Sequence, residues 1–325
     1  MKKFLILAIL LILTACGGRN ETPYEPTEPT TPPATTTPAP TPQPTPTPDR
    51  WANYAPLLWR ATSPTGQTMY LFGTFHAARA DLYPLPDFIM DAFHRSDYLM
   101  LEIDPRNQTA DFDDGLALHR YTDGRTVADD IGEELHAKAR ALLDGHRNPL
   151  RGIDNFDNYT PFVWYSAFTT ITTEQAGLYH RHGVDMHFFR EALLREIDIL
   201  EANPFLEQQE SGAGMSMELQ VLLLHDAVIN FNWNVQTTRE LYESWVRGDG
   251  QAIMEITAAV TAVLPAEFSE AALIERDILM AGRARELMAE GKKVFFAAGM
   301  LHFLHDRSII ALLEEAGYEI VRVMT

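Results

Sequence analysis

Two apolar runs in this sequence end in the same way, and together they constrain the fold more than any other feature. Residues 70–76 are YLFGTFH and residues 294–302 are VFFAAGMLH, so each run closes on Gly-x-x-His. A helical pattern and a second apolar run follow each histidine, over 84–104 in the first case and 306–324 in the second. The order strand, Gly-x-x-His, helix, strand therefore occurs twice, which is typical of βαβ units with parallel strands.

The region between these two units is predicted to be mostly helical. Helical patterns occupy 124–145, 148–177, 183–196, 217–249 and 267–291, and one short strand is expected at 198–202. The fold class that follows is α/β, with a central sheet built from both ends of the domain and a helical insert between them.

The first 50 residues have a composition that cannot form a globular core. Two lysines and an apolar stretch lead to Leu-Thr-Ala-Cys16, which predicts a signal peptide over 1–15 and resembles the lipobox of bacterial lipoproteins. The alternative is an ordinary signal peptide with an incidental cysteine. Residues 16–50 are rich in Pro and Thr and predict an extended linker, so the globular domain is expected over 51–325. We expect an extracytoplasmic protein that contacts the bacterial membrane only through a lipid on Cys16.

The composition also excludes several function classes. Cys16 is the only cysteine, which excludes cysteine nucleophiles, zinc–thiolate sites and redox chemistry in the domain. The formal net charge is −19 at pH 7, and no basic patch offsets it, so nucleic acid is not expected as a partner. No His-Glu-x-x-His, Gly-x-Ser-x-Gly or Walker motif is present. Any chemistry of the domain must therefore come from histidines and carboxylates outside these motifs.

The two histidines of the repeat and one glutamate are the main candidates for that chemistry. The repeat predicts that His76 and His302 lie at the carboxyl ends of parallel strands, where α/β folds bind ligands. Glu102 lies in the apolar run LMLEID, at the end of a strand that we expect to pair with the strand that carries His76. A buried carboxylate is costly unless it is paired or bound to a metal. The three residues are thus predicted to bind a divalent metal, and the alternative for Glu102 is a buried ion pair with Arg276.

The remaining histidines carry weaker signals. His180, His182 and His187 form the dense cluster YHRHGVDMH, but their spacing does not fit one helical face, and we interpret them as loop and surface residues. His305 either joins the site or faces solvent. Asp185 is expected to serve the N-terminus of a helix.

With these motifs, residues 59–323 resemble the TraB/GumN family, which includes the bacterial pheromone-shutdown proteins and the animal Tiki proteases. The resemblance is carried by LFGTFH, LMLEID, HGVDMHFFREA, DILEANPFLEQQ, IERDILMAGRARELM and AAGMLHFLHDRSIIALLEEAGYEIVRV. It implies a fold similar to that of erythromycin esterase and ChaN-like proteins. It also implies metal-dependent peptide hydrolysis, with manganese or cobalt as the favoured ion and zinc as an alternative.

The resemblance assigns roles to individual residues. The two Gly-x-x-His histidines and Glu102 match the family's motif positions, which implies that they are both metal ligands and catalytic residues. Glu201, Gln208 and Arg276 also fall on recurrent positions, which implies roles in substrate binding. Arg276 is in addition a candidate for stabilising the oxyanion of a hydrolytic reaction.

The leading hypothesis is a surface-anchored metal-dependent hydrolase, a metallopeptidase that cleaves peptides or exposed protein termini. The alternative is a lipoprotein without catalytic activity that sequesters a peptide pheromone, haem or a metal. Cleavage that a chelator abolishes would support the first hypothesis, and tight binding without cleavage would support the second.

Overall fold

The computed structural model describes residues 55–146, 153, 155–262 and 264–324. The predicted signal peptide, the lipidated cysteine and the Pro/Thr-rich linker lie outside these residues. In the part of the chain that is described, no helix has the length and apolar character needed to cross a membrane.

Six strands of the described chain form one mixed sheet in the order β4-β3-β5-β2-β1-β6. Their bounds are β1 Leu58–Thr62, β2 Thr68–Thr74, β3 Tyr98–Leu101, β4 Asp198–Glu201, β5 Val294–Gly299 and β6 Glu319–Arg322. The four strands β4, β3, β5 and β2 are parallel, whereas β1 is antiparallel to both of its neighbours. The predicted α/β class is confirmed, and β1 is a strand that the sequence analysis did not include.

The predicted pairing of the Glu102 strand with the His76 strand is wrong. The strand before Glu102, β3, pairs with β4 and β5, and β5 lies between β3 and β2. All six residues of β5 are buried. A strand that is apolar on both faces is stable only at the centre of a covered sheet, which explains why β5 inserts there. The two strands that lead to Gly-x-x-His are therefore direct neighbours.

Fourteen α-helices lie within the described residues, and most of them belong to the insert between β3 and β5. Their bounds are α1 Asp87–His94, α2 Pro105–Ala110, α3 Phe112–Ala117, α4 Val127–Ile131, α5 Glu133–Asp144, α6 Pro161–Gln175, α7 Val184–Leu194, α8 Phe205–Gly214, α9 Met217–Ile229, α10 Phe231–Arg247, α11 Gly250–Thr261, α12 Ala266–Ser269, α13 Glu275–Ala289 and α14 Ile309–Glu315. The single helix predicted over 124–145 is in fact two helices, because Gly132 has a φ of 78° and breaks the chain between α4 and α5.

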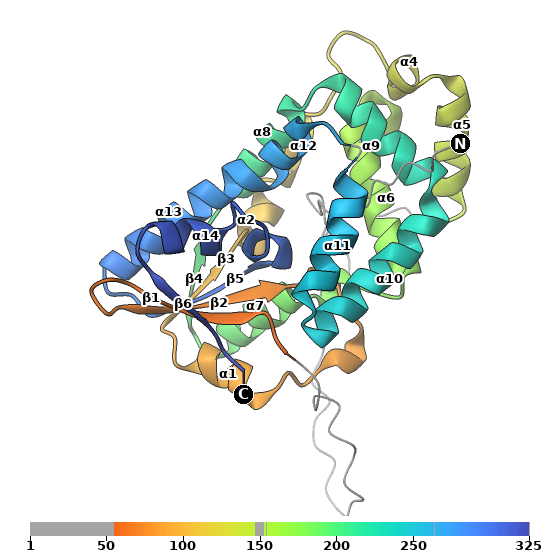
Figure 1. Ribbon diagram of the computed structural model, residues 1–325. Helices are drawn as coiled ribbons and strands as arrows, with labels where there is room; N and C mark the ends of the chain where they lie inside the picture. The colour runs from red at the N-terminus through yellow and green to blue at the C-terminus, as the bar shows by residue number, and fades with distance from the viewer. Residues whose placement is uncertain (1–54, 147–152, 154, 263, 325) are drawn as a thin grey trace, which may run out of the picture.

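Helices cover both faces of the sheet. Figure 1 shows α13 and α14 on one side and α1 and α7 on the other, with α6 and α9 to α11 beyond one edge. On the α1 and α7 side, the rings of Phe93 and Phe188 pack against Phe295 of β5. On the opposite side, Phe296 packs against Phe303. Successive residues of β5 thus anchor opposite layers, as the alternation of side chains along a strand requires.

Candidate active site

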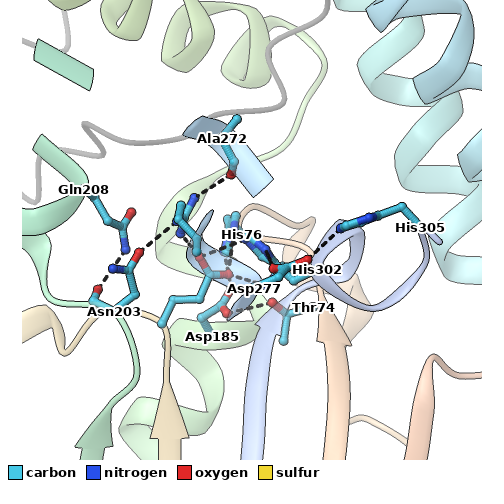
Figure 2. Close-up of polar contacts among 12 residues, drawn as sticks. Thr74, His76, Asp185, Asn203, Gln208, Ala272, Asp277, His302 and His305 are labelled. Carbon is cyan, nitrogen blue, oxygen red and sulfur yellow. Dashed lines mark hydrogen bonds and ion pairs between the residues drawn. The ribbon is translucent and has the colours of Figure 1, made fainter. Parts of the chain in front are cut away.

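His76, Glu102 and His302 meet at the carboxyl ends of the three central strands. Thr74, the last residue of β2, is in register with Gly299, the last residue of β5, and Glu102 directly follows β3. His76 lies two residues beyond β2, and His302 lies in a 3-10 turn that continues from β5. Parallel strands bring their carboxyl ends to one edge of a sheet, so residues far apart in the sequence come together there (Figure 2).

The carboxylate of Glu102 is the centre of this group. Its Oε1 accepts a short hydrogen bond from the backbone N–H of Gly299 and lies 3.5 Å from His76 Nε2. Its Oε2 lies 3.4 Å from His302 Nε2 and 2.5 Å from Arg276 Nη2. The alternative offered by the sequence, a buried ion pair with Arg276, is therefore confirmed. Glu102 also faces the two histidines, and its role as a metal ligand stays a prediction.

Gly299 allows the histidine and the glutamate to approach each other. A Cβ atom at this position would lie 2.8 Å from His76 Nε2 and 3.1 Å from Glu102 Oε1. Any other residue would therefore push these groups apart or lose the hydrogen bond from its own N–H to Glu102. The glycine of the second motif is a structural requirement of the site itself.

Asp185 fixes the orientation of His76. Its Oδ2 lies 2.8 Å from His76 Nδ1, and its Oδ1 accepts a hydrogen bond of 2.7 Å from the hydroxyl of Thr74. The expectation that Asp185 lies at a helix N-terminus is confirmed, because the residue is in the first turn of α7. The sequence analysis did not foresee that its carboxylate also bonds to Thr74 and His76. With Nδ1 held by a carboxylate, His76 presents Nε2 to Glu102.

Asp277 of α13 has the same role for His302. Its Oδ1 lies 2.5 Å from His302 Nδ1, and its Oδ2 lies 2.6 Å from His305 Nε2. The Asp277 side chain is fully buried. Of the two possibilities for His305, the structure supports the one in which this histidine joins the site, through Asp277.

Charge–charge interactions outweigh burial for all three central groups. Burial alone would lower the pKa of His76, but Asp185 and Glu102 raise it to about 9. Burial likewise opposes the charged form of His302, yet Glu102 and Asp277 raise its pKa above the ordinary value. For Glu102, burial favours the neutral acid, but His302, His76 and then Arg276 hold the pKa well below its usual range. The two imidazoles and the Arg276 guanidinium thus favour the ionised form of this one carboxylate.

Glu201 and Gln208, the other two predicted substrate-binding residues, support the site rather than touch the histidines. Glu201 accepts hydrogen bonds from the backbone N–H of Asp104 and from Asn107 Nδ2, at 2.9 and 2.8 Å, and so stabilises the start of α2. Gln208 donates to the backbone carbonyl of Asn203 at 3.0 Å. Neither side chain makes a hydrogen bond or ion pair with His76 or His302 within the described residues.

Asn203 connects Gln208 to the centre of the site. Its Oδ1 accepts a bond of 2.9 Å from Arg276 Nε, while Arg276 Nη1 donates to the carbonyl of Ala272 at 3.3 Å. Ala272 belongs to the π-helical turn Glu270–Ile274 that immediately precedes α13. Figure 2 shows this chain of contacts from Gln208 toward the histidines. It fixes the guanidinium that pairs with Glu102.

The interpretation of the cluster YHRHGVDMH as loop and surface residues is only partly right. His182 lies in a 3-10 turn, but His187 is part of α7 and stacks on Tyr83, with 4.5 Å between ring centroids. His180 has a structural contact inside the protein, because its Nδ1 donates a hydrogen bond to the carbonyl of His76 at 3.2 Å. Of the three histidines, His180 thus contacts the backbone of the first histidine motif.

Sequence reasoning did not identify Asp277, Thr74 or Asn203. One signal was available for Asp277, since it follows Arg276 directly in a helix whose neighbouring residues include Ile278, Leu279 and Met280. A charged pair with apolar neighbours indicates that the charges are used inside the protein. Thr74 and Asn203 offered no comparable signal.

The donor set is chemically suited to a divalent metal, although no three or more His, Cys, Asp or Glu side chains of the described residues form a ready-made metal cluster. Both histidines direct Nε2 toward Glu102 while carboxylates hold their Nδ1 atoms, which is the arrangement that prepares imidazole for metal binding. Ligand atoms bound at about 2.1 Å lie about 3 to 3.5 Å apart, close to the Nε2–Oε distances here. Each Glu102 oxygen also has a second lone pair beyond its bond to Gly299 or Arg276. These residues fit a metal.

A comparison with protein families identifies the family of this chain. The sheet with Gly-x-x-His at the ends of two neighbouring parallel strands, and a buried glutamate between the histidines, defines an α/β protein with one site at the carboxyl edge of its sheet. The model of the TraB/PrgY/gumN family matches residues 57–322, and the chain belongs to this family. No curated protein and no solved structure matches the chain, so the expected similarity to erythromycin esterase and ChaN-like folds stays a prediction.

Proposed function

We propose that this protein is a metal-dependent hydrolase, and specifically a peptidase that acts on peptides or exposed protein termini. The observation that carries the proposal is the convergence of two histidine Nε2 atoms on Glu102, each ring being oriented by its own aspartate. His76, Glu102 and His302 would hold the ion, with manganese or cobalt favoured and zinc as an alternative. When bound, such an ion supplies Lewis acidity that polarises a carbonyl and activates water.

The protein's own residues would perform the remaining tasks. Among the described residues, Arg276 directs three of its five N–H donors to Glu102, Asn203 and Ala272. The other two would be available for negative charge that develops on a substrate carbonyl. Access would be from the His76 side, because that side chain is 32% exposed whereas the Glu102 side chain is 8% exposed. Glu201 and Gln208 would act on the substrate indirectly, by fixing α2 and Asn203.

The proposed location and partners follow from the same reasoning. A peptide or protein substrate outside the cytoplasm fits a domain that a lipid on Cys16 would tether to the membrane. Labelled palmitate incorporated by the wild-type protein and absent from Cys16→Ser would support this anchor, and equal labelling of both proteins would contradict it.

The hydrolase proposal is tested by restoring metal to chelator-treated protein. Mn²⁺, Co²⁺ and Zn²⁺ are added separately, and a peptide library is screened for cleavage by mass spectrometry. Glu102→Gln is the matched control, because it keeps the shape of the side chain and removes its charge. Cleavage that depends on the ion and is lost in Glu102→Gln supports the proposal. Tight ion binding without any cleavage would favour the binding lipoprotein instead, and absence of ion binding would contradict the proposed site.

A further inference from the structure

His305 is the outermost member of a three-residue chain that ends at the site. Asp277 lies between His302 and His305 and gives one carboxylate oxygen to each, at 2.5 and 2.6 Å. The exposed fraction of the side chain is 5% for His302 and 0% for Asp277, and it is largest, at 13%, for His305. The chain therefore reaches from the buried centre of the site to the edge of the protein (Figure 2).

A backbone contact settles the position of the proton on a neutral His305 ring. The N–H of Arg307 donates to His305 Nδ1 at 3.2 Å. A ring nitrogen that accepts a hydrogen bond carries no proton, so the proton of His305 is on Nε2 and is donated to Asp277. Asp277 therefore accepts one N–H on each oxygen, from His305 on one side and from His302 on the other.

We propose that His305 is a positioning residue that acts through Asp277 to keep the Nε2 atom of His302 directed into the site. This inference rests on the proposed function, because it concerns the support of a proposed metal ligand. A carboxylate with a donor on each oxygen is held at two points against rotation about its Cβ–Cγ bond. A carboxylate with a single donor is held at one point only. Partners of this kind orient metal-binding histidines, and their loss lowers metal affinity.

His76 is also held by an aspartate with a second donor, but that donor is a hydroxyl and not an imidazole. Asp185 accepts one bond from His76 and one from the hydroxyl of Thr74, so Thr74 occupies the place that His305 has beside Asp277. Each aspartate thus has a second donor that belongs neither to the metal ligands nor to the substrate. An apolar residue in that place would leave a buried carboxylate oxygen without a partner, which is strongly unfavourable.

The experiment compares His305→Leu with His305→Gln. Leucine removes the donor, whereas the glutamine amide N–H can replace Nε2–H toward Asp277. Co²⁺ affinity, measured by titration of its visible absorption, should fall about 10- to 100-fold in His305→Leu and return close to wild type in His305→Gln. His94→Leu, at an exposed histidine of α1, is the matched control and should bind like wild type. In an Asp277→Asn background, His305→Leu should have no further effect, because both changes break the same chain.

A second measurement keeps this inference separate from the proposed function. Before any ion is added, the Nδ1 proton of His302 should give a downfield resonance protected from exchange, since it is bonded to a buried carboxylate. The resonance should be present in wild type and His305→Gln and lost or broadened in His305→Leu. If wild type binds no Co²⁺, the proposed function fails, and this resonance alone decides on His305. Equal Co²⁺ affinity or an unchanged resonance in His305→Leu would overturn the inference.

Discussion

The two Gly-x-x-His units share one sequence pattern but differ in how deeply their histidines are buried. The side chain of His76 is 32% exposed and that of His302 is 5% exposed. Their aspartates follow the same order, with Asp185 19% exposed and Asp277 fully buried. The motif therefore places a histidine at the end of each strand, and the surrounding helices decide its task. His302 is the buried histidine of the site, and His76 is the one that solvent can reach.

The glycines of the two units differ in the same way. A Cβ at Gly73 would lie 3.1 Å from the Cβ of Leu57 and 3.2 Å from the Cα of Met300, so this glycine allows backbone packing. A Cβ at Gly299 would instead meet His76 and Glu102. The register explains the difference, because Gly299 is opposite Thr74 and not opposite Gly73. The first unit is displaced by one residue relative to the second.

The largest expected effect is on the buried aspartate. Asp277→Ala leaves two histidines without their shared partner and should lower the free energy of unfolding by about 3–5 kcal/mol. Asp185→Ala, at the more exposed position, should cost clearly less. Urea unfolding of the two variants measures both values. Equal costs would mean that the two units do not differ in burial as the structure indicates.

The glycine pair should separate stability from metal binding. Gly73→Ala forces backbone and core atoms apart and should cost about 1–3 kcal/mol of stability, with little change in the metal affinity of the protein that remains folded. Gly299→Ala should weaken metal binding, because the new methyl group displaces His76 and Glu102. Thermal unfolding and Co²⁺ titration of both variants test this. The comparison fails if Gly299→Ala binds Co²⁺ as wild type does.

The smallest effect concerns pH. The pKa of His76 is about 9 in the folded protein against an ordinary value of 6.5, so the histidine stabilises the fold fully below about pH 6.5 and this contribution is lost as the pH rises through 9. In chelator, the melting temperature of wild type relative to His76→Gln should therefore fall by a few degrees over this range. If the difference in melting temperature between the two proteins does not change with pH, the pKa of His76 is not raised in the folded protein.

Much of the fold could be predicted from the sequence, because apolar periodicity is a local property. The sequence predicts the strands β2, β3, β4, β5 and β6, and it predicts the helical insert. Strand order was not predicted, because it depends on which run is buried on both faces, and only the full set of covering helices decides that for β5. The break at Gly132 was also missed, since a positive φ inside a helical pattern leaves no periodic signal.

The site shows a similar division. The repeat placed His76 and His302 together, whereas Glu102 was added because burying a carboxylate is costly and because its strand was expected to pair with that of His76. That pairing is wrong, but β5 lies between the two strands and the three side chains still meet. Their supporting partners were not predicted, because Asp185 and His76 are 109 residues apart and nothing local links them. Short-range rules assigned Asp185 to a helix N-terminus, where it does lie, but its hydrogen bonds to His76 and Thr74 determine where its carboxylate points.

The central claim is that the two Gly-x-x-His histidines and Glu102 act as one metal site. The most direct test is the shift in melting temperature that Mn²⁺ or Co²⁺ produces in His76→Ala, His302→Ala, Glu102→Gln and the double histidine variant, together with bound metal content. Wild type should show the shift, each single variant should largely lose it, and the double variant should be little worse than either single one, because ligands of one ion are not additive. Wild-type shifts and metal content in all three single variants would contradict the account.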